Sequence, residues 1–311
     1  MYLMKLSAAC KQYLWGGQNL KQYFGTKNAR DSLAEAWVVS AHENGMSKIE
    51  NGGLSGMDFA DAVKDTKLLG TKSTGGSFPV LIKLIDAEQN LSIQVHPDDV
   101  YANKRHGCPG KTEMWYILDC KPGAYIYYGF NKKVSRVEFL KSIENGNIIE
   151  LLNKVYVNKG DCFFIEAGTV HAICAGILLA EVQQNSDKTY RIYDYNRKDS
   201  DGKPRETHIE EAVQVSILDI PKHPVIKPNI LEEEIRLASC EYFTVKYMRG
   251  DNFKINVGKE SFAAVLILEG ESKIEYEGGS VNYKKYDSFF APAGLGELIF
   301  KGECRVLLTT L

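Results

Sequence analysis

Residues 160–171 read GDCFFIEAGTVH, and residues 286–297 read YDSFFAPAGLGE. The two stretches align without gaps, and in both a run of strand-forming residues leads into a glycine turn and a further short strand. Upstream, EMWYILDC at residues 113–120 aligns in the same way with AAVLILEG at residues 263–270. This internal similarity predicts that the chain contains two copies of one β module.

The two copies differ at positions whose side chains can bind a metal. Ala263 stands where the first copy has Glu113, and Glu297 stands where it has His171. No histidine follows His223. We therefore expect one chemical site, in the first copy, and a second copy that supports the fold.

Short runs of strand formers separated by turn residues indicate a mainly β fold, a sandwich or a barrel. These runs lie at residues 36–39, 80–85, 91–95, 115–118, 124–128, 162–165, 177–182, 243–248, 263–268, 272–276 and 304–309. A small helical insertion is expected near residues 135–153, because Ser135 and Glu138 form a capping box ahead of a helical pattern. A second short helix is expected at residues 148–152.

A further capped helical segment is expected to begin at Thr207 and to run into a cluster of prolines at residues 221–228. That cluster is the best candidate for a domain boundary. We expect a metal-binding module at residues 1–220, which contains the helical insertion, and a degenerate module at residues 221–311.

The bulk composition excludes several classes of function. The 311 residues carry a net charge of −2, which gives no large positive field for nucleic acid or anionic membranes. No apolar run approaches the roughly 20 residues needed to span a bilayer, so the chain is expected to be cytoplasmic. The seven cysteines include no C-x-x-C pair and are expected to be reduced, which argues against a cysteine-ligated metal.

Four side chains of the first copy could form a metal site. The period of two in a strand puts Gln94 and His96 on one face. If Glu113 and His171 point into the same barrel, two imidazoles, one carboxylate and one amide oxygen meet, a set that suits zinc and leaves room for water or substrate. A single histidine in a strand is more often a core or surface residue. The combination, and its loss from the second copy, favours the metal site.

These residues resemble the cupin signatures. Gly160, Gly168 and His171 fall in place in the second signature, where Glu166 replaces a proline. In the first signature Gln94 stands where many cupins have histidine, and the glutamate comes late, after an insertion. Both departures are features of the type I phosphomannose isomerases. The resemblance extends over residues 13–17, 35–37, 40–42, 78–83, 91–98, 110–116 and 189–195, and covers roughly residues 10–210 of a chain similar to the short bacterial form.

The resemblance implies a fold of two cupin (jelly-roll) modules and one Zn²⁺ per chain, held by Gln94, His96, Glu113 and His171. It implies catalytic roles for Lys111, Glu181 and Arg191, and a substrate site formed by Lys111, Arg191 and Ser92. Asp187 and Asp194 are weaker candidates. His42 and Glu35 are expected to be scaffold residues, and Lys83 is either a site residue or an ordinary solvated lysine.

The implied activity is the interconversion of D-mannose 6-phosphate and D-fructose 6-phosphate through an enediol, with a sugar phosphate as the small-molecule partner. The base that moves the proton is either Glu181 or Lys111, and Arg191 holds either the phosphate or the enediolate. Two alternatives stay open: a non-catalytic cupin that binds sugar phosphates, and a metal-dependent cupin oxygenase. The sequence does not set the oligomeric state, the physiological metal or the direction of the pathway.

Overall fold

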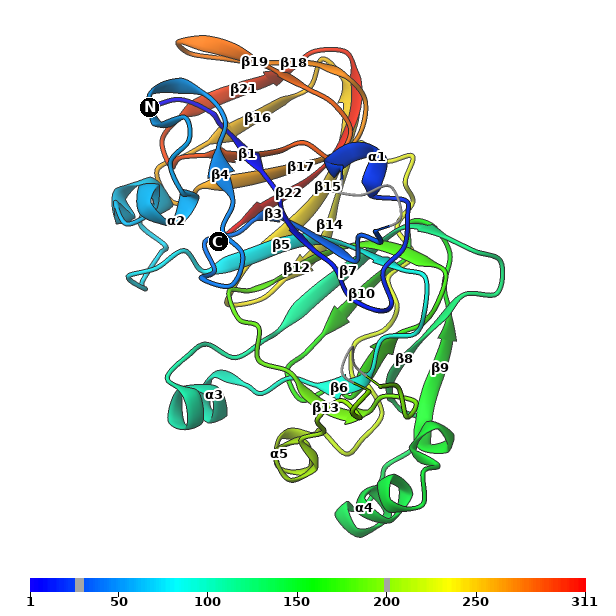
Figure 1. Ribbon diagram of the computed structural model, residues 1–311. Helices are drawn as coiled ribbons and strands as arrows, with labels where there is room; N and C mark the ends of the chain where they lie inside the picture. Colours follow the sequence, from blue (N-terminus) through cyan, green and yellow to red (C-terminus); the bar gives the residue numbers. More distant parts are fainter. Residues whose placement is uncertain (26–30, 199–201) are drawn as a thin grey trace.

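The computed structural model describes residues 1–25, 31–198 and 202–311. It consists of β-sheets stacked in layers, with short helices at the edges (Figure 1). We call the part that contains β5 the first module and the part that contains β17 the second module. Each module has an inner sheet that faces the other module and an outer sheet beyond it, so the predicted mainly β fold of two modules is confirmed.

The strands of the first module follow in the order in which they pair. The inner sheet runs β10 (Cys162–Ile165), β7 (Glu113–Cys120), β12 (Ile177–Gln184), β5 (Val80–Ala87), β3 (Glu35–Val39) and β2 (Ala9–Lys11). The outer sheet runs β13 (Tyr190–Tyr193), β6 (Ile93–Val95), β11 (His171–Ile173), β8 (Tyr125–Phe130) and β9 (Leu152–Tyr156).

The second module repeats this arrangement. Its inner sheet runs β14 (Glu234–Ser239), β15 (Thr244–Asp251), β22 (Glu303–Thr310), β17 (Ala263–Glu269), β20 (Ser288–Ala291), β1 (Met4–Ser7) and β4 (Lys48–Ile49). Its outer sheet runs β16 (Lys254–Val257), β21 (Gly296–Phe300), β18 (Ser272–Tyr276) and β19 (Gly279–Tyr283). The N-terminal strand β1 therefore belongs to a sheet built mostly from the C-terminal third of the chain.

The internal repeat of the sequence is a repeat of strand register. In the first module Glu113 pairs with Ile165, and in the second the aligned residues Ala263 and Ala291 pair in the same way. The turns match as well, because the Ile117 amide donates to the Asp161 carbonyl at 2.9 Å and their counterparts, Ile267 and Asp287, repeat this bond at 2.9 Å. The ungapped alignment thus predicts which residues face each other.

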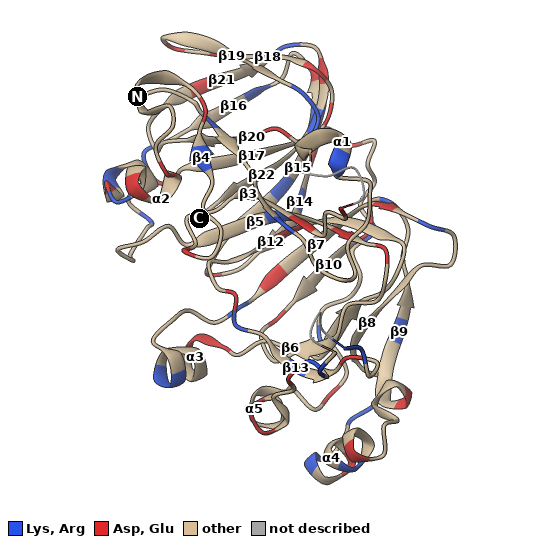
Figure 2. Ribbon diagram, in the orientation of Figure 1, with Lys and Arg blue, Asp and Glu red and all other residues tan. Residues whose placement is uncertain are grey.

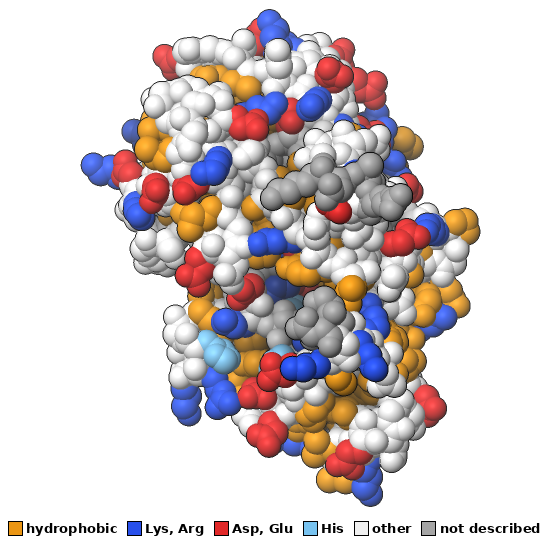
Figure 3. Space-filling view, in the orientation of Figure 1, with side chains coloured by type: hydrophobic (Ala, Val, Ile, Leu, Met, Phe, Trp, Pro, Cys, Tyr) orange, Lys and Arg blue, Asp and Glu red, His pale blue; other side chains and the backbone are white. Residues whose placement is uncertain are grey.

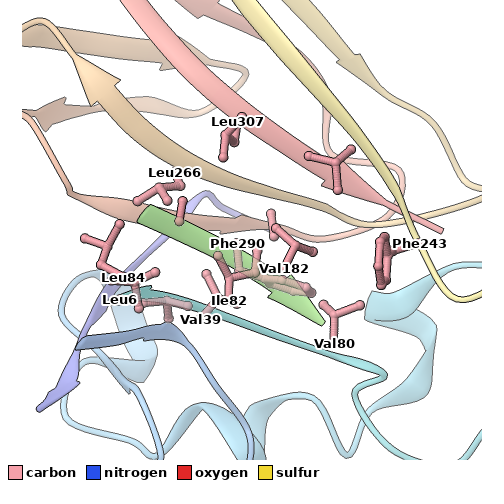
Figure 4. Packing of buried hydrophobic residues seen from close by; sticks show 14 of the residues in the cluster. Leu6, Val39, Val80, Ile82, Leu84, Val182, Phe243, Leu266, Phe290 and Leu307 are labelled. Atoms are coloured by element: carbon pink, nitrogen blue, oxygen red, sulfur yellow. The ribbon is translucent and has the colours of Figure 1, made fainter. Parts of the chain in front are cut away.

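Apolar side chains from both inner sheets form one core between the modules (Figure 4). Ile82 and Val182 enter it from the first module, and Leu266, Phe290 and Leu307 enter it from the second. Separate cores fill each module between its own two sheets. In the first module that core leaves part of the space between the sheets open, and the candidate site lies there.

Helices are peripheral. The bounds are α1 (Lys21–Phe24), α2 (Phe59–Ala62), α3 (Asp99–His106), α4 (Arg136–Glu144) and α5 (Ile209–Val215), with 3₁₀ turns η1 (Gly52–Leu54), η2 (Thr66–Leu69) and η3 (Ile148–Leu151). Helices α4 and α5 contribute to an apolar cluster with the outer sheet of the first module, and α3 lies beside this sheet in Figure 1.

The helix caps confirm one prediction and correct another. Ser135 caps α4, since its hydroxyl accepts a bond from the Glu138 amide at 3.1 Å. The second short helix of the insertion is the 3₁₀ turn η3. Thr207 does not cap α5, because that helix begins at Ile209 and its N-cap residue, His208, makes no side-chain cap. Helix α3 was not predicted from the sequence; Asp98 caps it by accepting from the Tyr101 amide at 2.8 Å.

All seven cysteines lie in the described residues and are free thiols. Within the described ranges, no helix has both the length and the apolar character needed to cross a bilayer.

Candidate active site

A cavity of about 320 Å³ opens between the two sheets of the first module. One wall comes from β3, β5 and β12 of the inner sheet, and the facing wall comes from β6, β11 and β13 of the outer sheet. Its lining is mostly polar and charged: Tyr13, Trp15, Glu35, Trp37, Lys83, Ile85, Leu91, Ser92, Gln94, Lys111, Ile173, Glu181, Asp187, Thr189, Arg191 and Arg205.

Three potential metal ligands meet at the cavity, next to Gln94 and Lys111. The side chains of His96, Glu113 and His171 are buried, and one donor atom of each lies within 4.8 Å of the others. Glu113 stands between the imidazoles, with Oε2 3.5 Å from His96 Nε2 and Oε1 3.5 Å from His171 Nε2. Glu113 starts β7, His171 starts β11 and His96 directly follows β6, so three strand ends supply the group.

Hydrogen bonds to backbone carbonyls fix which nitrogen of each imidazole faces the site. Nδ1 of His96 lies 2.9 Å from the carbonyl oxygen of Lys188, and Nδ1 of His171 lies 2.8 Å from that of Thr169. A carbonyl only accepts, so each Nδ1 carries the proton and each Nε2 presents a lone pair to Glu113. Burial and then the Lys111 charge lower the pKa of both histidines, that of His171 to about 4, which keeps both rings neutral.

Gln94 lies beside the three residues. Its backbone pairs with that of His171, and its side-chain Nε2 lies 3.4 Å from His171 Nε2, while Oε1 accepts from the Ser92 hydroxyl at 3.2 Å. The two ends of an amide are assigned from their hydrogen bonds, so a half-turn of this group would present its oxygen to the site. Gln94 and His96 thus both lie beside the cluster of Glu113 and His171, in agreement with the shared strand face that their spacing predicts.

Opposite charges alternate along the inner wall. Lys83 Nζ lies 3.8 Å from Glu35 and 3.0 Å from Glu181. Lys111 Nζ lies 3.5 Å from Glu181 and 3.1 Å from His96 Nε2, and contacts Glu113 more closely. Every lysine in this row therefore touches two carboxylates.

The carboxylates of the row have different environments. Burial and then the charge of Glu181 raise the pKa of Glu113, and Glu113 Oε1 is buried without a hydrogen-bond partner among the described residues. Burial alone would also raise the pKa of Glu181, but Lys111 and Lys83 outweigh it and lower that pKa. Trp115 Nε1 donates to Glu181 Oε2 at 2.9 Å and fixes its orientation. Glu181 is therefore an ionised carboxylate whose orientation is fixed by Trp115.

Arginines gather at the outer wall. Arg191, on β13, donates from Nη1 to the carbonyl oxygen of Glu206 at 2.7 Å. Arg205 donates from Nη1 to the buried carboxylate of Asp194 at 3.3 and 3.4 Å, and Arg197 contacts the same carboxylate. Burial, followed by the charge of Arg205, lowers the pKa of Arg191. Asp194 is thus paired with Arg197 and Arg205.

The positive groups of the cavity are a local feature. Lysine, arginine and acidic residues alternate over all parts of the fold (Figure 2), and both signs are interspersed on the molecular face in Figure 3. This agrees with the net charge of −2.

Comparisons with known proteins match this arrangement. The model of the type I phosphomannose isomerase catalytic domain matches residues 3–120, and that of the mannose-6-phosphate isomerase cupin domain matches residues 233–311. Mannose-6-phosphate isomerase ManA of Bacillus subtilis is 38% identical over 97% of this chain and 96% of its own. The chain belongs to the type I phosphomannose isomerase family.

Two further comparisons support the assignment. The mannose-6-phosphate isomerase of Streptococcus mutans is 34% identical, over 97% of this chain and 96% of its own length. The crystal structure of the Bacillus subtilis mannose 6-phosphate isomerase superimposes with a TM-score of 0.90 at 33% identity, over all of both chains. The cupin modules inferred from residues 160–171 are therefore the fold of this family.

The structure brings the predicted site residues of this family member to one cavity. Ser92, Gln94, Lys111, Glu181 and Arg191 line it, and the two imidazoles with their shared carboxylate lie next to it. Their individual roles stay predictions.

Three further residues line the cavity: Lys83, whose role the sequence left undecided, Glu35, which was expected to be a scaffold residue, and Arg205, which was not predicted. Lys83 is buried and ion-paired, so it is not a solvated lysine, and its place amid the apolar residues of β5 was the available signal. Glu35 accepts a bond from Trp37 Nε1 at 2.6 Å while facing Lys83. Arg205 lies in a segment without strand or helix pattern, so no periodicity in the sequence pointed to it.

Proposed function

We propose that this chain interconverts D-mannose 6-phosphate and D-fructose 6-phosphate. The observation that carries this function is the donor set of Gln94, His96, Glu113 and His171 beside a polar cavity, in a chain related over its full length to mannose-6-phosphate isomerases. The substrate partner is then a sugar phosphate, and a cytoplasmic location remains a prediction.

The donor set fits one Zn²⁺ per chain, held by these same four residues. Two neutral imidazoles present Nε2 lone pairs, and a carboxylate between them keeps one oxygen without a partner among the described residues. Burial of that carboxylate is costly unless a cation compensates its charge. The ammonium group of Lys111 contacts the His96 imidazole and the Glu113 carboxylate, which supports the view that the donor set attracts a positive charge. Nitrogen and oxygen donors of this kind suit zinc.

When bound, zinc supplies electrophilic stabilisation of the negative charge that develops on the sugar oxygens. The proton has to leave one carbon and return to its neighbour, and we assign that transfer to the pair Lys111 and Glu181, whose side chains lie 3.5 Å apart at the cavity wall. Trp115 and Lys83 hold Glu181 in place for this step. Arg191 faces the opposite side of the cavity and binds a negative group there.

Turnover of mannose 6-phosphate before and after chelation tests the substrate, the reaction and the metal together. We expect conversion that stops with a strong chelator and returns with added zinc, and slow conversion of unphosphorylated mannose. A zinc-loaded protein without turnover would contradict the isomerase. Turnover that survives complete removal of metal would contradict the metal assignment alone.

Neither alternative has a specific observation in its favour. An oxygenase would consume oxygen with Fe(II), which an oxygen electrode detects directly. A binding module would take up the sugar phosphate without converting it. The ion-paired Lys111 and Glu181 beside the donor set favour catalysis over both.

A further inference from the structure

The outer wall of the cavity carries a second arginine whose role the activity alone does not assign. We propose that Arg205 acts together with Arg191 as an anchor for the phosphate group of the substrate, so that two guanidinium groups bind one phosphate monoester. This inference rests on the proposed function and names a specificity-determining residue for it.

Hydrogen bonds hold the segment that directly follows Arg205 against Arg191 on β13. Residues 206–208 fold back along β13, since the His208 amide donates to the Arg191 carbonyl at 2.8 Å and Glu206 accepts from the Arg191 side chain. Arg205 directly precedes this segment and lines the same cavity as Arg191. The fold therefore presents both guanidinium groups to one space.

The positive charge that carboxylates neutralise least lies on the arginine side of the cavity. Lys83 and Lys111 are each paired with two carboxylates, as described above. Arg205 and Arg197, in contrast, share the single carboxylate of Asp194. An added anion is consequently favoured near the arginines more than near the lysines.

The donors that remain suit a phosphate group. A guanidinium group has five N–H donors, and among the described residues the bonds of the Arg205 side chain use only Nη1. Nε of Arg191 is buried without a partner in the described part of the chain. Arginine forks match phosphate oxygens, and an anion between two guanidinium groups also removes their mutual repulsion. Ser92 and Thr189 line the same cavity, but their hydroxyl groups already donate to Gln94 Oε1 and to the carbonyl oxygen of Asp187, so the arginines supply the donors.

Arg197 provides a matched control. It contacts the same Asp194 carboxylate, but its Nη1 donates to the carbonyl oxygen of Asn90 at 2.6 Å and it is absent from the cavity lining. A purely structural role, acting through Asp194, would make Arg197 and Arg205 equivalent. Of these two arginines, a phosphate anchor requires only Arg205.

Calorimetric titration with fructose 6-phosphate and with inorganic phosphate tests the anchor without relying on turnover. We expect Arg205→Ala to weaken both affinities by about tenfold or more, Arg205→Lys to restore part of them, and Arg197→Lys to leave them near wild type. In the isomerase assay, Arg205→Ala should raise KM for mannose 6-phosphate more than it lowers kcat. Circular dichroism and the melting temperature check that each variant is folded.

Three results would overturn the anchor: a folded Arg205→Ala protein with wild-type affinities, equal losses in Arg197→Lys and Arg205→Lys, or a wild-type protein that binds neither ligand. If the wild type binds both ligands in an Arg205-dependent way but converts no mannose 6-phosphate, the anchor stands and the isomerase proposal fails. If the wild type is an active isomerase whose phosphate affinities do not depend on Arg205, the isomerase proposal stands and the anchor fails.

Discussion

The tautomer of each imidazole is set outside the donor set, at the backbone of Lys188 and Thr169. Their carbonyl oxygens accept hydrogen bonds from Nδ1–H of His96 and His171, so the Nε2 lone pair of each ring faces Glu113. Because the acceptors are backbone atoms, they cannot be lost by a side-chain substitution. The arrangement is therefore prepared for a cation by the fold itself.

Replacing a ligand should remove the metal while leaving the fold intact. We expect His171→Ala to lower zinc affinity by at least about 100-fold, since even the loss of a supporting contact costs 10- to 100-fold. Elemental analysis after dialysis measures this directly. His223→Ala is the control, because that histidine is 45% exposed in its side chain, faces Glu166 and is not one of the clustered donors. A His171→Ala protein with a full complement of zinc would remove this residue from the site.

Arg191→Lys should reduce kcat/KM by roughly 100-fold, the scale for loss of a preorganised charge-stabilising donor, because lysine cannot reproduce the planar fork. Zinc content should not change. A raised KM with kcat preserved would indicate uniform phosphate binding, whereas equal losses in kcat and kcat/KM would indicate a contact made mainly in the transition state. Arg249→Lys, in the second module, is the matched control. Wild-type kinetics in a folded, zinc-loaded Arg191→Lys protein would contradict a role for Arg191.

The sequence predicts the donor set but only part of its surroundings. Strand periodicity places Gln94 and His96 on one face, the comparison of the two copies singles out Glu113 and His171, and the family resemblance joins the four into one set. The pairing of Lys83 with two glutamates depends on strands β3, β5 and β12 lying side by side, which strand periodicity alone does not give. Arg205 reaches the cavity through a loop, and loop paths have no periodicity to read.

At the scale of elements, the internal repeat predicts the strand register more reliably than capping residues predict where a helix begins. The aligned copies pair residue for residue in β7 with β10 and in β17 with β20, because a shift by one residue would turn the buried face of a strand outward. A cap depends on one side chain and one backbone angle. Ser135 meets both conditions, with an extended backbone and a hydroxyl that accepts from the Glu138 amide, whereas Thr207 lies before the N-cap position of α5.

The two caps therefore give a paired prediction. Ser135→Ala should destabilise α4 by about 0.5–2 kcal/mol through loss of the bond to the Glu138 amide. Thr207→Ala should leave α5 nearly unchanged, since Thr207 is exposed and lies before the N-cap of that helix. Hydrogen exchange of the helix amides measures both effects. Equal exchange rates in Ser135→Ala and wild type would show that the cap contributes nothing.

At the scale of the whole molecule, we propose that the two modules, which the sequence divides into residues 1–220 and 221–311, fold as one unit, although β1 and β4 complete the inner sheet of the second module. The boundary cannot separate them cleanly, because Met4 on β1 pairs with Phe290 on β20. The inner sheets also share one apolar core (Figure 4), in which Phe290 packs against Phe59 and Phe78 of the N-terminal part at ring distances of 5.0 and 5.8 Å. The degenerate module thus supports the sheet that carries Glu113 and Glu181.

This coupling can be measured with the native tryptophans. The chain has three, Trp15, Trp37 and Trp115, so their fluorescence reports on the first module alone. Phe290→Ala opens a cavity in the shared core and should lower the free energy of unfolding by about 3–5 kcal/mol. If the modules unfold together, the tryptophan transition in urea should shift by as much as the transition seen by circular dichroism.

Phe289→Ala separates coupling from simple contact with the first module. Phe289 neighbours Phe290 on β20 but points to the opposite face, into the core of the second module. Its loss should shift the tryptophan transition too, although the side chain lies outside the core that the modules share, because a cooperative unit transmits lost stability from any buried position. If Phe290→Ala moved the fluorescence and Phe289→Ala did not, the second module would act only through the shared core. If neither variant moved it, the two modules would be independent, and the second would not stabilise the sheet that bears the site.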